Sequence, residues 1–190
     1  KVVVTAAALE NGANPDEQLT AAPNITLPGT STTLENYNGS TCGGAPTASL
    51  REAFARSCNT AFVELGIRTG SEALADQSAA FGIGPGAPGI PIPVADSTIG
   101  PIPDDAALGQ SSIGQRDVAL TPLQNAEIAA TIANGGMRME THLVSQLQGP
   151  DLSNLATTSP KSLGRAVSPE VAETLTQLMI GSENSTAGQG

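Results

Sequence analysis

The pattern of apolar and polar positions along the chain predicts a series of short helices. Residues 2–10 are mostly Val, Ala and Leu, and Gly12 just beyond them can take the left-handed conformation that ends a helix. Apolar residues recur at helical spacing over residues 49–56, where Ser49 and Glu52 have the spacing of a capping box. These segments are the first two helices that we expect.

Four further segments carry the start and stop signals of helices. A cap at Asn59 or Thr60 and a cap at Ser71 begin two helices in close succession, while Thr121 stands as a cap directly before Pro122 at the first helical position. The last segment opens on the same arrangement of cap and proline. The expected helices cover residues 59–68, 71–81, 120–134 and 168–180.

Helical periodicity is absent from the remaining segments. Between residues 15 and 46 the chain is rich in Thr, Asn, Gly and Pro, and residues 24–27 and 31–34 are expected to form short strands. Residues 82–105 are a Gly- and Pro-rich loop, longer than compact domains usually contain without a function. Residues 137–147 are predicted to be a strand or one arm of a hairpin. No internal repeat is visible.

The composition limits the class of protein. A chain of 190 residues with 39% hydrophobic residues can bury one core, as a single domain or as a large lobe of a bigger domain. The 8 Lys and Arg against 18 Asp and Glu give a net charge of -10, the wrong sign for a surface that binds nucleic acid. Aromatic residues make up 2%, so Ala, Leu, Ile and Val must build the core. The longest apolar stretch, residues 2–9, is far shorter than the roughly 18 residues that span a bilayer.

Several common catalytic and binding sites are excluded by the residues present. His142 is the single histidine and is expected at the surface in a strand, and two cysteines are too few for a zinc site. Residues 109–113 lack the second glycine of a nucleophile elbow. The glycines at 84–86 and 135–136 lack the neighbours of a phosphate loop or a dinucleotide fingerprint, and are expected to be turns and caps.

Serine chemistry that uses lysine in place of histidine remains, and three parts of the chain fit it together. The first runs from Lys1 to Gly12, and the second is the Ser-x-Asn triplet of Ser57 and Asn59. The third is residues 114–136, with its Leu-Thr-Pro-Leu-Gln and Ala-Asn-Gly-Gly sequences. In this order and at these separations, the chain resembles the transpeptidase domain of class B penicillin-binding proteins.

The resemblance implies an α/β (α+β) fold of the penicillin-binding protein and β-lactamase type, a central antiparallel sheet flanked by helices, of which this chain is the mostly helical portion. The family uses three motifs, Ser-x-x-Lys, Ser-x-Asn and Lys-Thr-Gly, that meet in one cleft. Lys1 would be the lysine of the first motif, with the nucleophilic serine three residues before it, and the Lys-Thr-Gly strand would follow Gly190. Residues 1–190 are then part of one transpeptidase domain, cut between nucleophile and third motif, and are not expected to form an acyl-enzyme alone.

The resemblance also implies catalytic roles for three residues. Positions i and i+3 share one face of a helix, so the Lys1 amine can contact the serine hydroxyl one turn earlier and act as its base once burial favours the neutral amine. Ser57 would relay a proton to the leaving amine, and the Asn59 amide would bind the substrate peptide group. Without the resemblance, Lys1 would be a solvated charge, and Ser57 and Asn59 would be a helix end and a cap.

The activity that the resemblance implies is D,D-transpeptidation: attack on the D-Ala-D-Ala end of a peptidoglycan stem peptide, release of D-Ala, and transfer to an amine on a neighbouring strand. β-Lactam antibiotics would acylate the same serine, and no metal or organic cofactor is needed. The alternatives are D,D-carboxypeptidase or β-lactamase activity, a non-catalytic penicillin-binding sensor, and a helical interaction module.

The resemblance further implies where the parent chain acts. It would lie on the extracytoplasmic face of the bacterial cell membrane, anchored by an N-terminal transmembrane helix outside this chain, with proteins of cell-wall synthesis and division as partners.

Cys42 and Cys58 are expected to form a disulfide. The family's catalytic domain lies outside the cytoplasmic membrane, where disulfides persist, and an even pair without metal partners suits a bridge. The bridge would tie the loop before the helix at 49–56 to the residue between Ser57 and Asn59. Two small buried thiols are the alternative.

Overall fold

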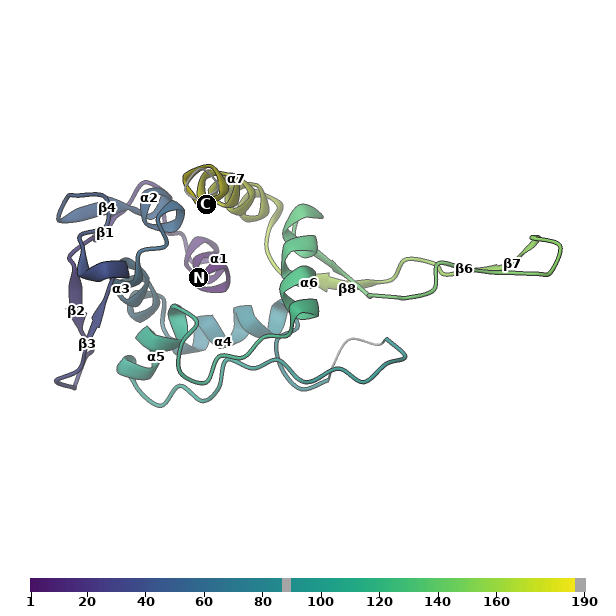
Figure 1. Cartoon of the computed structure of the whole chain (residues 1–190), viewed down its shortest axis with the longest axis horizontal. Helices are drawn as coiled ribbons and strands as arrows, with labels where there is room; N and C mark the ends of the chain where they lie inside the picture. Colours follow the sequence, from purple (N-terminus) through teal and green to yellow (C-terminus); the bar gives the residue numbers. More distant parts are fainter. Residues whose placement is uncertain (87–89, 187–190) are drawn as a thin grey trace.

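A computed structural model describes residues 1–86 and 90–186 of the chain (Figure 1). These residues form seven α-helices: α1 (Val2–Glu10), α2 (Leu50–Ala55), α3 (Asn59–Thr69), α4 (Ser71–Ala80), α5 (Asp105–Ser112), α6 (Pro122–Ala133) and α7 (Pro169–Thr186). None of these helices is both long and apolar enough to cross a membrane.

The strands in the same residues are short and pair as four separate two-stranded antiparallel sheets. The pairs are β1 (Gln18–Thr20) with β4 (Thr47–Ser49), β2 (Asn24–Thr26) with β3 (Thr33–Glu35), β5 (Met137–Met139) with β8 (Ser162–Arg165), and β6 (Gln146–Gln148) with β7 (Asn154–Thr157). A 3-10 turn over Tyr37–Gly39 follows β3.

Helix α1 runs through the centre of the helical body. Every side chain from Val4 to Leu9 is buried, and α3, α4 and α7 pack around it (Figure 1). A helix that is apolar on all sides is stable only inside a core, because no face of it prefers water. The core around α1 is mainly Ala, Leu, Val and Ile, with three large aromatic side chains, Phe54, Phe62 and Phe81. Lys1 therefore stands at the edge of the core, where α1 begins.

The β2–β3 sheet lies against α3. Ile25 pairs with Leu34 across this sheet, and Leu34 packs with Leu27 and with Val63 of α3 in a small apolar cluster separate from the main core. This cluster fixes the end of β3 beside the first turn of α3. The residues that follow β3 are consequently held close to the start of that helix.

Residues 137–165 form an arm that extends away from the helices (Figure 1). β5 and β8 pair at its base, with a register shift between Arg138 and Met139, and β6 pairs with β7 farther out. The side chains of β6 and β7 are exposed. The arm therefore contributes little to the core.

Several predicted helix starts are confirmed by their hydrogen bonds. α1 covers the predicted residues 2–10. Ser49 caps α2 by accepting from the N–H of Glu52, and Thr121 caps α6 by accepting from the N–H of Gln124. α7 starts at its predicted proline and continues beyond the predicted end to residue 186.

Two predicted caps are wrong. Cys58 is the N-cap of α3, so Asn59 and Thr60 are already helical. Gly70 is the N-cap of α4, so Ser71 is the first residue of that helix. In the first case the physical reason is that both polar side chains hydrogen-bond to other segments, which leaves neither to cap its own helix.

Other elements were not predicted or differ from the prediction. Helix α5 was not predicted, because its pattern is broken by Gly109 and two serines, although Asp104 caps it by accepting from the N–H of Ala107. Strands β2 and β3 overlap the two short strands expected at residues 24–27 and 31–34, whereas β1, β4, β7 and β8 were not expected. The segment 137–147 divides between β5 and the start of β6.

The predicted loop between α4 and α5 contains no helix or strand in the described part of residues 82–104. Thr98 forms an isolated bridge with Ala119, which ties the loop to the segment before α6. Residues 87–89 of this predicted loop lie outside the described residues.

The packing of α3 on α5 depends on a glycine, and this generates a test of the fold. A Cβ at Gly66 would lie 1.8 Å from Ser112 Oγ, whereas a Cβ at Gly181 in α7 would meet nothing within 4 Å. Gly66→Ala is expected to destabilise the protein by about 1–3 kcal/mol through overpacking. Gly181→Ala should stabilise it by about 0.5–1 kcal/mol through helix propensity. Thermal unfolding measures both, and a stabilising Gly66→Ala would contradict the α3–α5 packing.

Candidate active site

Lys1, Ser57 and Asn59 come together at one point. The Lys1 Nζ donates to the Ser57 carbonyl oxygen at 2.7 Å, to the Ser57 Oγ at 2.7 Å and to the Asn59 Oδ1 at 2.8 Å. An ammonium has three N–H donors, and three oxygens receive them here. The structure thus joins the start of α1 to the connection between α2 and α3.

The Lys1 amine loses its proton more easily than an exposed lysine does. Burial lowers its pKa from the usual 10.5 to about 8. Within residues 1–86 and 90–186 it has no carboxylate partner within 4 Å, so no counter-ion opposes this effect of burial. The ring centroid of Phe62 lies 5.7 Å from Nζ. The amine is therefore set between an aromatic ring and three uncharged oxygens.

Ser57 occupies a turn that usually requires glycine. Its φ is 57°, and it follows Arg56, the C-cap residue of α2, which still has helical backbone angles. The N–H of Ser57 donates to the Phe54 carbonyl and the N–H of Cys58 to the Ala53 carbonyl, which is the hydrogen-bond pattern of a Schellman motif. Glycine is favoured at this position because it has no Cβ, so a serine here costs conformational energy. The turn aims both oxygens of Ser57 at Lys1.

Asn59 stands in the first turn of α3 with its amide held on both sides. Its Oδ1 accepts from Lys1 Nζ, and its Nδ2 donates to the Glu35 carbonyl oxygen at 2.9 Å. A flipped amide would turn N–H groups toward the ammonium and an oxygen toward the carbonyl. These two contacts therefore fix the amide orientation, and they leave the second N–H of Nδ2 for another acceptor.

The expected disulfide is present. Cys42 and Cys58 are bonded, with their Cα atoms 5.8 Å apart and a sequence separation of 16. Cys58 lies between Ser57 and Asn59, so the bridge fastens the site to the loop before β4.

Two cavities border the site, and Ser57 lines both of them. One, of about 300 Å³, is also lined by Lys1, Phe54 and Met179. The other, also of about 300 Å³, lies on the side of Cys42. Ser57 thus contributes to the walls of two cavities.

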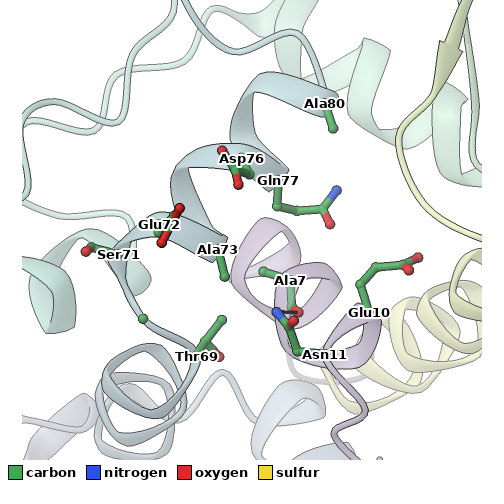
Figure 2. A pocket seen from close by; sticks show the side chains of 11 residues that line it. Ala7, Glu10, Asn11, Thr69, Ser71, Glu72, Ala73, Asp76, Gln77 and Ala80 are labelled. Atoms are coloured by element: carbon green, nitrogen blue, oxygen red, sulfur yellow. Dashed lines mark hydrogen bonds between the residues drawn. The ribbon is translucent and has the colours of Figure 1, made fainter.

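A larger cavity lies elsewhere, between α1 and α4 (Figure 2). Its volume is about 720 Å³, and the carboxylates of Glu10, Glu72 and Asp76 line it. Lys1, Ser57 and Asn59 do not line it. Its size alone does not make it the active site, because the polar groups suited to catalysis are at the other location.

The remaining candidates from the sequence are not at the site. His142 is exposed but lies in the connection between β5 and β6, so its predicted strand is wrong. Residues 109–113 belong to the end of α5 and the residue after it, not to an elbow. In residues 1–86 and 90–186, no group of three His, Cys, Asp or Glu could hold a metal ion.

Glu35 and Asn36 also contribute to the site, although no sequence motif indicated them. Glu35 acts through its backbone carbonyl, which no side-chain motif can indicate. Asn36 is buried, and its side chain bonds the start of α3. The only available signal was a polar residue two positions after the strand predicted at residues 31–34.

Comparison with known proteins identifies the class of protein that this fold and site define. The penicillin-binding protein transpeptidase domain family matches residues 1–190. The chain belongs to this family. Its expected mixed α/β fold is confirmed by the crystal structure of PBPA from Mycobacterium tuberculosis, which matches with a TM-score of 0.92 and 62% identity over 97% of this chain and 43% of that one.

Two further relatives are informative. The peptidoglycan D,D-transpeptidase PbpA of Mycobacterium tuberculosis strain H37Rv is 60% identical over 190 residues, which are 100% of this chain and 39% of that protein. The penicillin G acyl-enzyme complex of penicillin-binding protein A from M. tuberculosis matches with a TM-score of 0.92 and 62% identity, over 97% of this chain and 42% of that one. The chain thus spans about two fifths of the length of these relatives.

The disulfide yields a prediction on stability. Replacing Cys42 and Cys58 together by Ser is expected to lower the free energy of unfolding by about 3 kcal/mol, because the unfolded chain regains the freedom of the closed loop. Thermal unfolding with and without dithiothreitol measures this effect. The reductant should lower the melting temperature of the wild type and leave that of the double variant unchanged. Equal melting temperatures of the wild type and the double variant without dithiothreitol would contradict a structural role for the bridge.

Proposed function

We propose that the full-length protein is a serine-type peptidoglycan D,D-transpeptidase, and that residues 1–190 form part of its single transpeptidase domain. In this proposal the nucleophilic serine lies three residues before Lys1 and the Lys-Thr-Gly strand follows Gly190. The observation that carries it is the Lys1 amine, which donates to both Ser57 and Asn59 and has its pKa lowered to about 8 by burial. The printed activity of PbpA and the acyl-enzyme complex of its structural relative support it.

Lys1 acts as the general base. Near pH 8 about half of an amine with this pKa is neutral and can take the proton of the serine hydroxyl. The serine Oγ then bonds to the carbonyl carbon of the penultimate D-Ala. As the C–N bond to the terminal D-Ala breaks, that amine leaves with a proton.

Ser57 and Asn59 serve the leaving group and the substrate backbone. The Ser57 Oγ, 2.7 Å from Nζ, can pass the proton from Lys1 to the leaving amine. The second N–H of the Asn59 amide can donate to a substrate carbonyl oxygen. An amine of a neighbouring stem peptide then attacks the ester, its C–O bond breaks, and the serine regains its proton.

The setting of the reaction follows from the substrate. Peptidoglycan lies outside the cytoplasmic membrane, so we infer that the full-length protein acts on that face, held by a transmembrane helix N-terminal to residue 1. We further infer that it works beside other proteins of cell-wall synthesis and division. β-Lactams are its inhibitors, because they acylate the same serine.

The direct test is the intact mass of the full-length protein before and after incubation with penicillin G. The mass is expected to rise by one antibiotic, and Lys1→Ala should slow this step by about a hundredfold or more because the base is lost. Lys161→Ala is the matched control, since it removes the chain's other lysine at an exposed position on the arm. An unmodified wild-type protein would favour a non-catalytic homologue. Rapid loss of the adduct with turnover of penicillin would favour a β-lactamase.

Ser57→Gly separates catalysis from stability. Glycine relieves the positive φ of this turn, so the melting temperature is expected to be unchanged or higher. Acylation by penicillin G should nevertheless fall by about a hundredfold, because the hydroxyl that relays the proton is gone. Both are measured on the same sample. Acylation at the wild-type rate would remove Ser57 from the mechanism.

A further inference from the structure

Cys58 leaves α3 without a side-chain cap. It is the N-cap residue, and its side chain makes no capping hydrogen bond, because its sulfur is bonded to Cys42. The first N–H groups of a helix have no partner within the helix and must find one elsewhere. The N–H of Thr60, in this first turn, donates at 3.0 Å to the Oδ1 of Asn36. Asn36 thus replaces the missing cap from another segment of the chain.

Both ends of the Asn36 side-chain amide form hydrogen bonds. It is 6% exposed and Thr60 is fully buried. The Asn36 Nδ2 donates to the Ala22 carbonyl at 2.9 Å and to the Ser40 carbonyl at 3.2 Å. The Asn36 Nδ2 also donates to the Thr60 Oγ1 at 3.2 Å, so its two N–H groups are shared among three acceptors. The Thr60 hydroxyl donates to the Ala22 carbonyl at 3.0 Å.

The peptide group before Asn36 leads directly to the active site. Its carbonyl is that of Glu35, which accepts from Asn59 Nδ2 at 2.9 Å, and its N–H donates to the Pro23 carbonyl at 3.0 Å. Because a peptide group is planar, the position of Asn36 sets the direction of the Glu35 carbonyl. That carbonyl sets the orientation of the Asn59 amide, and hence which of its atoms faces Lys1.

We propose that Asn36, together with Thr60, is a positioning residue that orients the Asn59 amide toward Lys1 through the Glu35 peptide group. The inference rests on the proposed function, since Asn59 is a catalytic residue there. Asn36 does not touch the reacting atoms. It ties three segments, the end of β3, the turn at Ser40 and the start of α3, into one rigid unit beside Asn59.

The test is a double-mutant cycle on the rate constant of acylation by penicillin G in the full-length protein. Asn36→Ala is expected to lower this rate at least tenfold in the wild-type background. In the Asn59→Ala background it should change the rate less than twofold, because the amide it orients is absent. A merely structural role would lower the rate by the same factor in both backgrounds, and that result would overturn the inference.

Three further variants keep the test valid if Asn36→Ala folds poorly. Thr60→Val preserves the shape of the side chain but loses its hydroxyl, and should slow acylation several-fold, while Thr60→Ser should restore it. Gln124→Ala is the control for lost stability, since this buried side chain donates to the Phe81 carbonyl and touches none of the site residues. It is expected to lower the melting temperature and leave the acylation rate unchanged.

The outcomes also separate the inference from the proposed function. A wild-type protein that is acylated, together with an Asn36→Ala variant acylated within twofold of it, overturns the inference alone. A wild-type protein that is never acylated overturns the proposed function and the inference with it.

Discussion

The site depends on one contact, in which the Lys1 ammonium donates to two oxygens of Ser57 and one oxygen of Asn59. It joins Lys1 to Ser57 and Asn59, which lie 56 and 58 positions later in the sequence. Because α1 is apolar on all sides, the core fixes its position, and the amine at its start is held with little freedom. The disulfide and the Asn36 hydrogen bonds hold the acceptor side of this contact, which Ser57 and Asn59 form.

Two features of the site cost conformational or desolvation energy, and the surrounding structure offsets this cost. A serine takes a left-handed backbone conformation, and a lysine is partly buried without a carboxylate partner. Such departures persist at functional sites when neighbouring structure over-determines them. Here the Cys42–Cys58 bridge and the buried Asn36 side chain hold the turn from two directions. Because the Cys58 sulfur is bonded to Cys42, it does not cap α3. The Asn36 side chain accepts from the first turn of α3 in its place.

The sequence indicated that Lys1, Ser57 and Asn59 come together, which the structure shows, but it indicated less of what surrounds them. The family resemblance rested on the order and spacing of these residues together with residues 114–136, and local signals such as the Thr121 cap located most helices. The sequence could not show that Asn59 lies inside α3, because its amide is bonded by Lys1 and Glu35, both remote in sequence. Helix α5 was not predicted either, because its pattern is set by contacts with a remote segment. Its small residues serve close packing on α3 and give no amphipathic pattern.

The most direct measurement is an NMR titration of the lysine side chains in the full-length protein, labelled with 13C at Cε. The signal that disappears in Lys1→Arg belongs to Lys1. The structure predicts a midpoint of about 8 for this signal, because burial without a counter-ion disfavours the charged amine. A midpoint near the usual 10.5 would mean that the amine is solvated and charged at neutral pH, and it would contradict the proposal that Lys1 is the base.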